Sequence, residues 1–585
     1  MVWAFAKLAY ADAPLLEASA SQAAWQIHAF SEQGLVNTVW AFAKLQFSHA
    51  PFMGAISAVV QEQLAKFTPR YLSNISWAFS ALKVHDGPML AAIAQASQTK
   101  IREFNCQDLA NMLWSMATLA VSLPPEMLAL AAEATALRLH DFESQGLANT
   151  SWSLAVLEFR DVPLMHAMSA VVSLKASSFS SQELCNTIWA FATLKVLDEP
   201  FFQAVADAVY PRLFQFLPVD LANTAWAFAT VEFRNKPLVA AIEEVAEQRF
   251  GAWCSRPEDD AAVVNVLSVV EALGRLDLKE SLVSAASAAL CDRAQRLDQS
   301  YQEQPLLEEL RVTTERLAVD SVTEPRVLAS FPGLCVLWKP PGWSAALEDP
   351  KSESDKDFAL RRWLQRHFGK SSPIVYDEGE TYGLVHRLDR FTSGPLLWAP
   401  CYRGLFEARL QFAARQVCKE YLCIGQGWLQ LSSGPRHLKA PLKEELAIEG
   451  ELQLARSRVN RISGKWAHTE VSEAVLLSGP DGESYTLMKV RLHTGRTHQI
   501  RCHLSHEGHP LLGDPVYGGP TPGWSSRHWL HAWRLQLRIS SGKVDLQVPV
   551  PVDLQEALRR LAPASLQEAY KLKLLIGDTG TSAKK

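Results

Sequence analysis

The sequence predicts an all-α helical-repeat solenoid followed by an α+β domain with a mostly antiparallel sheet. Tryptophan recurs every 37 or 38 residues through the first half, and a period of this length is typical of stacked helical repeats. From about residue 326, apolar and polar residues alternate in short runs, which is typical of strands. Because a chain of 585 residues is too long for one hydrophobic core, we expect at least two domains.

Three recurrent positions define the repeats, which we place at residues 1–250. The tryptophans are Trp3, Trp40, Trp77, Trp114, Trp152, Trp189 and Trp226. A phenylalanine lies ten residues before each of the last six, at Phe30, Phe67, Phe104, Phe142, Phe179 and Phe216. An asparagine lies three residues before the same six, at Asn37, Asn74, Asn111, Asn149, Asn186 and Asn223. The common spacing predicts that every repeat folds alike and stacks on its neighbours.

The repeat that begins at Phe179 illustrates why the unit is helical. Ser180 and Glu183 have the spacing of a capping box, which starts a helix. Leu184, Ile188 and Phe191 then lie on one face of that helix. A second helix is expected in each unit. Because one helix pair cannot bury its apolar face alone, neighbouring units must pack together.

The tryptophan and asparagine positions each have two interpretations. The tryptophans are either core residues or a platform on which bases stack, and we expect core residues. The asparagines form either a buried ladder that satisfies backbone groups of the next repeat or a set of base-recognition groups. We expect the ladder, because each asparagine lies one helical turn before a tryptophan.

Charge and composition limit the classes of partner. The chain is 48% hydrophobic and 20% charged, which is ordinary for a globular protein. Residues 1–250 carry 15 Lys and Arg against 22 Asp and Glu, a net charge of 15 − 22 = −7. Such an array lacks the general phosphate attraction of most nucleic-acid binders, so a protein partner competes with RNA as its ligand.

Several features bear on the compartment. No apolar run is long enough to span a bilayer. The nine cysteines contain no CxxC pair, which favours a reducing, intracellular environment. The first residues resemble the middle of a repeat rather than a targeting peptide, so we expect further sequence upstream of Met1.

The second half reads as mixed strands and helices. Apolar and polar residues alternate over 488–492 and again over 533–539, where a Ser-Gly-Lys turn leads into a partner strand at 544–548. Helices are expected at 356–368 and 402–415. We assign residues 251–325 to a degenerate repeat and helical linker, residues 326–562 to the second domain, and residues 563–585 to a C-terminal tail.

Two basic clusters lie about a hundred residues apart in this domain. Asp389 stands among His386, Arg387 and Arg390, and the segment 493–501 adds two arginines and two histidines. An isolated aspartate beside an arginine is most often a simple salt bridge. Two such clusters together instead indicate an enzyme that holds a polyanion and acts on it with one carboxylate.

These segments resemble the RluA-type pseudouridine synthases. The family core His-Arg-Leu-Asp-x-x-Thr-Ser-Gly is present at 386–394. The other family-like pieces, in order, are Trp338–Gly342, Lys419–Tyr421, Gly464–Thr469, Thr494–Arg501, Gly513–Gly518 and Leu530–Ala532. The resemblance implies the pseudouridine synthase fold for residues 326–562, an isomerase that converts uridine to pseudouridine in rRNA, tRNA or organellar RNA, and no cofactor. It implies an RNA substrate and no DNA or membrane partner.

The resemblance also implies roles for individual residues. Asp389 is the expected catalytic carboxylate, and Tyr421 is expected to stack on the target base, although a core tyrosine with a satisfied hydroxyl is the alternative. Arg496 is our first choice for the cation that orients Asp389, with Arg501 second. Further substrate contacts are expected from His386, Arg387, Arg390, Ile500 and Arg501; Arg387 would fill the space left by the flipped uridine, whereas His386 is expected mainly to pack or hydrogen-bond within its loop.

The repeats resemble octotricopeptide-like and FAST-kinase-type helical repeats of organelle RNA proteins, on the Leu-Ala-Asn-Thr-x-Trp-Ala-Phe pattern at 221–228. By that resemblance they select RNA, and the chain is expected in a mitochondrion or chloroplast. The alternative function is a non-catalytic RNA-binding or scaffold protein that retains an inactive synthase domain. Three histidines at 503, 506 and 509 have a spacing that would allow a metal site, but no supporting ligand cluster is near, so we expect none.

Overall fold

The computed structural model describes residues 1–256, 259, 261–276, 278–300, 323–345, 359–431, 434–449, 452–461, 463–480 and 482–576. Contacts divide the chain into two compact units, Met1–Val245 and Ala246–Lys585. Part of the predicted linker and the end of the predicted tail lie outside the described residues. None of the helices in the described ranges is both long and apolar enough to cross a bilayer.

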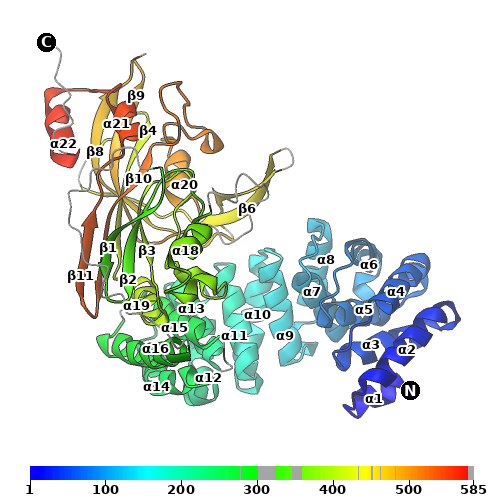
Figure 1. Ribbon diagram of the computed structural model, residues 1–585. Helices are drawn as coiled ribbons and strands as arrows, with labels where there is room; N and C mark the ends of the chain where they lie inside the picture. Colours follow the sequence, from blue (N-terminus) through cyan, green and yellow to red (C-terminus); the bar gives the residue numbers. More distant parts are fainter. Residues whose placement is uncertain are drawn as a thin grey trace. The chain divides into compact units, whose positions relative to one another are not determined.

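The first unit is a two-layer stack of helices (Figure 1). Odd-numbered helices pack on one another in sequence to form one layer, and even-numbered helices lie in the other. The odd-numbered helices are α1 Val2–Lys7, α3 Glu32–Lys44, α5 Pro69–Ala81, α7 Cys106–Thr118, α9 Ser144–Val156, α11 Ser181–Thr193 and α13 Pro218–Thr230. The even-numbered helices are α2 Ala13–Trp25, α4 Ala50–Gln63, α6 Gly87–Lys100, α8 Pro125–Ala136, α10 Val162–Lys175, α12 Glu199–Val209 and α14 Lys236–Cys254, the last of which runs past the end of the unit. The predicted all-α solenoid is confirmed.

Local capping explains where these helices begin. The predicted capping box is present, since Ser180 Oγ accepts from the Glu183 amide and Glu183 accepts from the Ser180 amide. Leu184, Ile188 and Phe191 are all buried on the predicted face. Each odd-numbered helix is followed by a non-glycine residue in the left-handed region, namely Ala9, Gln46, Lys83, Ala120, Glu158, Lys195 and Glu232.

The tryptophan and asparagine columns differ from the sequence prediction. The tryptophans from Trp40 to Trp226 are half-buried rather than core residues, and Trp3 is 48% exposed. Two neighbouring pairs of rings stack, with centroids 6.5 Å apart for Trp40–Trp77 and 6.3 Å apart for Trp189–Trp226. The six asparagine side chains are not buried, and they hydrogen-bond to no other described residue, so the expected ladder is absent. The phenylalanines fill the core instead, because five of the six are buried.

The second unit is built on antiparallel sheets (Figure 1). A seven-stranded sheet has the order β11-β10-β4-β9-β8-β12 with β5 also paired to β8, a three-stranded sheet has the order β1-β2-β3, and β6 pairs with β7. The strands are β1 Arg326–Phe331, β2 Leu334–Lys339, β3 Gly394–Trp398, β4 Cys418–Gln426, β5 Arg436–Leu438, β6 Leu442–Glu449, β7 Leu452–Val459, β8 Thr469–Ser478, β9 Ser484–Leu492, β10 Leu530–Ile539, β11 Gly542–Gln547 and β12 Ala562–Pro563. The predicted strand over 488–492 and the predicted β10–β11 hairpin are both present.

Helices accompany these sheets. They are α15 Ala262–Leu273, α16 Glu280–Ser300, α18 Leu360–Phe368, α19 Tyr402–Ala413, α20 Gln499–His506, α21 Val552–Leu558 and α22 Leu566–Ile576. The expected helices near 356–368 and 402–415 are therefore found as α18 and α19, apart from the part of the first that lies outside the described residues. Helix α22 falls in the predicted tail, yet its leucines Leu572 and Leu575 are buried in the core beside β8.

Helices α15 and α16 pack on α19, so the predicted linker region joins the core of the second unit. The contact is specific, because Asp298 of α16 accepts hydrogen bonds from the backbone amides of Tyr402 (2.9 Å) and Arg403 (3.2 Å). Helix α19 has no side-chain cap of its own, so Asp298 satisfies two amides that would otherwise lack partners.

Candidate active site

Asp389 lies on a loop that leads into β3, and a buried lysine donates hydrogen bonds to the backbone of this loop. Lys339, at the end of β2, is fully buried. Its Nζ donates to three carbonyl oxygens, those of Thr392 (2.8 Å), Arg390 (2.9 Å) and Pro340 (3.1 Å). Two of these carbonyls follow Asp389 within three residues, so the lysine fixes the backbone that carries the carboxylate.

A buried arginine holds the other side of this loop. Arg527 donates to the Phe391 carbonyl (2.8 Å) and to Ser393 Oγ (3.0 Å), and its Nε pairs with Asp553 at 2.6 Å. Gly394 then enters β3 with φ of +137°, and a Cβ there would lie 2.3 Å from the Ala532 carbonyl oxygen. The glycine of the motif is needed for this close approach of the two sheets.

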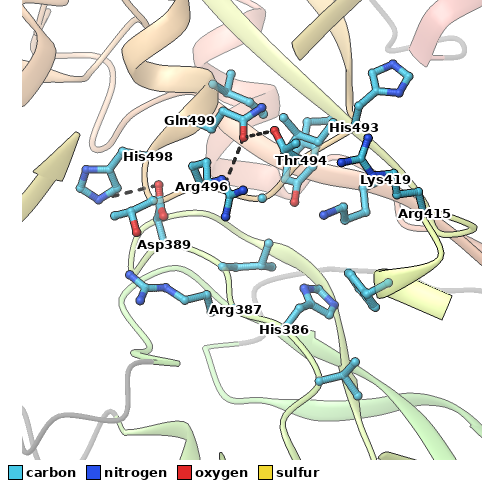
Figure 2. A pocket seen from close by; sticks show the side chains of 18 of the residues that line it. His386, Arg387, Asp389, Arg415, Lys419, His493, Thr494, Arg496, His498 and Gln499 are labelled. Carbon is cyan, nitrogen blue, oxygen red and sulfur yellow. Dashed lines mark hydrogen bonds and ion pairs between the residues drawn. The ribbon is translucent and has the colours of Figure 1, made fainter. Parts of the chain in front are cut away.

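The Asp389 carboxylate faces a pocket of about 560 Å³ (Figure 2). Its walls come from the 385–392 loop, β4, the loop before α20, and one face of α15. Tyr421, Ile500 and Arg387 line it together with Asp389. The structure thus brings segments more than a hundred residues apart around one carboxylate.

The cation beside Asp389 is Arg501 rather than Arg496. Arg501 Nη1 lies 3.5 Å from Asp389 Oδ2, while its Nε and Nη2 form a fork with Asp514 at 2.7 and 2.8 Å. Burial opposes the charge on Arg501, but the hydrogen bonds and charge of Asp514 raise the pKa of the guanidinium. Our second choice for the orienting cation therefore holds the position beside Asp389, while the role of Arg496 stays a prediction.

Arg496 lines the same pocket in a different place. Its Nε donates to the Trp466 carbonyl (3.2 Å), and its backbone amide donates to Gln499 Oε1 (3.0 Å), as Figure 2 shows for the second contact. Gln499 also accepts from Thr494 (2.7 Å), so one amide side chain fixes the turn that carries the arginine. The position suits a contact with substrate more than the orientation of Asp389.

His498 is a neighbour of the carboxylate that the sequence analysis did not single out. Its Nε2 lies 4.0 Å from Asp389 Oδ2, and its Nδ1 lies 3.2 Å from the Tyr517 hydroxyl. It has a left-handed backbone (φ 51°) immediately before α20, which directs the ring toward the loop. Burial lowers its pKa although Asp389 favours the charged form. The Arg-Thr-His-Gln run could have identified it.

Tyr421 is 7% exposed and lines the pocket from β4. Burial, reinforced by the charge of Asp389, raises its pKa, so its hydroxyl keeps its proton at neutral pH. Within the described part of the chain no group hydrogen-bonds to this hydroxyl. Tyr421 is thus a residue of the hydrophobic core whose hydroxyl lacks, among the described residues, the partner that the alternative required, and its stacking on a target base stays a prediction.

The remaining predicted contacts fall into two groups. Arg387 is exposed and Ile500 is buried, and both line the pocket. His386 also lines it, but its Nε2 accepts from the Leu397 amide (3.1 Å) and burial lowers its pKa to about 3, so it is a neutral structural group. Arg390 is not among the lining residues; its Nε donates to the Gly342 carbonyl at 3.1 Å.

The histidines after Ile500 serve the fold. His503 contacts Thr469 Oγ1 (2.8 Å) and the Ala440 carbonyl (2.7 Å), and His509 contacts the Gln426 carbonyl (2.9 Å). Over the described ranges no group of three or more His, Cys, Asp or Glu side chains has the geometry of a metal site.

Comparison with known proteins finds two family matches in the helical array. Residues 52–199 match the family described as RNA-editing substrate-binding complex 6 protein, and residues 130–269 match the N-terminal domain of the Tbc2 translation factor.

The second unit matches the family described as RNA pseudouridylate synthase, over residues 333–506. The ribosomal large subunit pseudouridine synthase D of Nitrosomonas europaea is 36% identical over 200 residues, which cover 32% of this chain and 53% of that protein. An uncharacterized RNA pseudouridine synthase of Chlorobaculum parvum is 32% identical over 227 residues, covering 34% and 64%. The solved structure of human RNA pseudouridylate synthase domain containing 1 aligns over 46% of this chain and 99% of that one, with 20% identity and a TM-score of 0.32. The chain thus spans less than two thirds of the length of the two bacterial relatives. The matched residues 333–506 include the loop of Asp389 and the segment of Arg501, so the pocket described above is built largely from the part of the chain that is similar to RNA pseudouridylate synthases.

Proposed function

We propose that this chain isomerises uridine to pseudouridine in RNA, with Asp389 as the catalytic carboxylate. The observation that carries the proposal is one carboxylate, 18% exposed, held 3.5 Å from a buried arginine at a pocket that is also lined by Tyr421, whose hydroxyl is hydrogen-bonded by no described residue. The match of residues 333–506 to the synthase family supports the same reaction.

The chemistry requires little beyond this set. The N1–C1′ bond of uridine breaks, the ring turns, a C5–C1′ bond forms, and the proton on C5 is released while N1 gains one, so atoms and electrons balance without a cofactor. An ionised carboxylate stabilises the positive charge that develops on the sugar or forms a transient covalent adduct. Arg501 places a positive charge 3.5 Å from this carboxylate. Tyr421 and Ile500 offer the faces between which a flipped base would lie.

The test replaces Asp389 with asparagine in the full-length protein. We expect loss of pseudouridine formation, measured as tritium release from RNA labelled at C5 of uridine and by mapping modified positions. Asp545→Asn is the matched control, because Asp545 pairs with Arg534 on the exposed β10–β11 hairpin, and its activity should be unchanged. An active Asp389→Asn protein would refute the assignment, whereas an inactive wild-type protein that binds RNA would favour the non-catalytic alternative.

We also propose that the tryptophan–asparagine column of the first unit contacts RNA and selects the substrate. The half-buried indoles, of which two neighbouring pairs stack, leave ring surface for bases, and the asparagine amides next to them are available as donors and acceptors. The names of the two matched families, an RNA-editing substrate-binding protein and a translation factor, are in keeping with this role. The acidic charge of the array implies that recognition depends on stacking and hydrogen bonds more than on phosphate contacts.

This role can be tested with Asn74→Ala and Asn186→Ala together in an Asp389→Asn background. We expect weaker binding to the RNA that the wild-type protein modifies. The slope of log Kd against log salt should be unchanged, since amide contacts to bases release no counterions. Unaltered RNA binding would instead assign the column to a protein partner.

For the compartment, we propose a mitochondrion or chloroplast, on the resemblance of the repeats to organelle RNA proteins alone. Imaging of the product of the complete transcript, fused to a fluorescent protein, tests it, and a nuclear or cytosolic signal would contradict it.

A further inference from the structure

One wall of the catalytic pocket comes from outside the synthase family match. Helix α15 presents Val264, Leu267, Ser268 and Glu271 to the pocket, at the spacing of a single helical face. Its opposite face is buried in the second unit. Residues 262–273 precede the family match at 333–506, so this wall lies outside the matched region.

The position of α15 is fixed by close packing at its end. Gly274, which caps the helix, lies against the end of α19, because a Cβ there would be in van der Waals contact, at 3.4 Å, with the Ala413 carbonyl oxygen. The capping of α19 by Asp298 fixes the next helix, α16, in the same interface. The wall is therefore part of the folded core rather than a loosely attached segment.

The residue after this cap, Arg275, joins a cluster at the edge of the pocket. The guanidinium carbons of Arg275 and Arg415 lie 5.3 and 4.8 Å from the centroid of the Trp466 ring. Arg496 donates to the carbonyl of the same tryptophan. Trp466 is thus the centre around which three arginines from three separate segments collect.

The cluster is rich in cations that repel one another. Burial and the charge of Arg415 lower the pKa of Arg275 to about 10, and burial and Arg496 lower the pKa of Lys419 to about 8. Glu271, an exposed carboxylate on the pocket face of α15, opposes these shifts for Arg275 and Arg415. An anion placed among these cations would be attracted to all of them and would reduce their mutual repulsion.

We propose that Arg275 and Arg415 on Trp466, together with Arg496, bind a phosphodiester of the RNA strand beside the flipped uridine, and that α15 closes the pocket on that side. The inference rests on the proposed function for the identity of the strand. Arginine suits the task because its planar fork matches phosphate oxygens while its face stacks on an indole. The helical segment before the synthase domain then contributes directly to the substrate site.

The experiment uses the full-length Asp389→Asn protein and a fluorescein-labelled single-stranded oligouridylate, with anisotropy read over roughly 50 to 200 mM salt. Arg275→Gln should weaken binding roughly three- to tenfold and reduce the slope of log Kd against log salt by about 0.7, the value for one phosphate contact on a single strand. Glu271→Gln should act in the opposite direction and tighten binding roughly two- to fivefold. Arg538→Gln is the matched control, because Arg538 is exposed on β10 away from the pocket lining, and it should change neither quantity.

Equal slopes for Arg275→Gln and Arg538→Gln, or no tightening by Glu271→Gln, would overturn the proposal. If Arg275→Gln lowers the unfolding temperature, Glu271→Gln decides alone, because that side chain is exposed and its replacement leaves the packing intact. Competition by inorganic phosphate as strong as that by the oligonucleotide would assign the cluster to a free anion and also overturn it. These readouts measure binding only, so they are separate from the test for pseudouridine, whose absence in the wild-type protein would refute the proposed reaction instead.

Discussion

Replacing Arg501 with lysine keeps a positive charge beside Asp389 but removes the planar fork that serves two carboxylates at once. Arg501 is 7% exposed, and its Nε and Nη2 pair with the fully buried Asp514 while Nη1 lies 3.5 Å from Asp389. A lysine has one nitrogen in place of three. We expect it to stay with Asp514, where an unpaired buried carboxylate would cost the most free energy, and to leave Asp389 without its cation.

The magnitude follows from the geometry. Loss of one charge-assisted hydrogen bond to Asp514 should lower the free energy of unfolding by about 1.5–3 kcal/mol. Two unit charges at the observed 3.5 Å interact by about 1 kcal/mol in a water-like dielectric and about 5 kcal/mol at an effective dielectric of ~20. Asp389 is partly exposed, at 18%, so we take a middle value of about 3 kcal/mol. That corresponds to a loss of about 100-fold in the rate of the chemical step.

The assay is single-turnover tritium release at saturating RNA, with urea unfolding measured in parallel. Arg496→Lys is the comparison, because the sequence favoured that residue for the same role. We expect Arg496→Lys to raise KM and to leave the rate of the chemical step within about threefold. A larger loss of that rate for Arg496→Lys than for Arg501→Lys would refute the reasoning from the ion pair.

Three further changes test other parts of the site. Tyr421→Phe should lower kcat by at least about 100-fold if the hydroxyl moves a proton. The same change should alter the free energy of unfolding by less than about 0.5 kcal/mol, because no described residue hydrogen-bonds to the hydroxyl. A larger loss of stability would contradict this prediction. The pKa of Lys419, lowered to about 8, predicts that RNA affinity falls as pH rises from 7 to 9, and that Lys419→Met, measured in an Asp389→Asn background, removes the dependence. Folding stability changes with pH in the opposite direction. The unfolded chain keeps the Lys419 proton up to about pH 10.4, so the free energy of unfolding rises over this interval. Unfolding would therefore not explain the loss of RNA affinity. Asp298→Ala should cost about 1–2 kcal/mol in urea unfolding by removing the cap of α19, and Asp298→Asn should restore part of it.

Most of the fold could be predicted because local signals agreed with the tertiary structure. The Ser180–Glu183 capping box, the buried Leu184 face and the β10–β11 hairpin all follow from short-range spacing, and all are present. The tryptophan column was misjudged because periodicity shows that a residue shares one face of the array but not whether that face is buried. The left-handed residues that end the odd-numbered helices gave no signal either, since none is a glycine.

The candidate site likewise contains residues that the sequence predicted and contacts that it did not predict. Motif order identified Asp389, Tyr421 and Ile500, which line one pocket. It could not decide between Arg496 and Arg501, because that choice depends on Asp514, a buried partner thirteen residues beyond Arg501 that holds only one of the two arginines. Nor could it indicate the wall made by α15, since that contact is set by the packing of α19 and has no counterpart in the family motifs.

The capping of α19 by Asp298 has a consequence for any hybrid in which the repeat array is exchanged for another helical module. A splice near residue 326, where the strands begin, would strip α19 of its cap and open the pocket beside Glu271. A splice ahead of α14, the helix that runs across the unit boundary at 245 and 246, retains both α15 and α16 and cuts no helix. Swaps made there should keep the wall of the pocket and the cap of α19 intact.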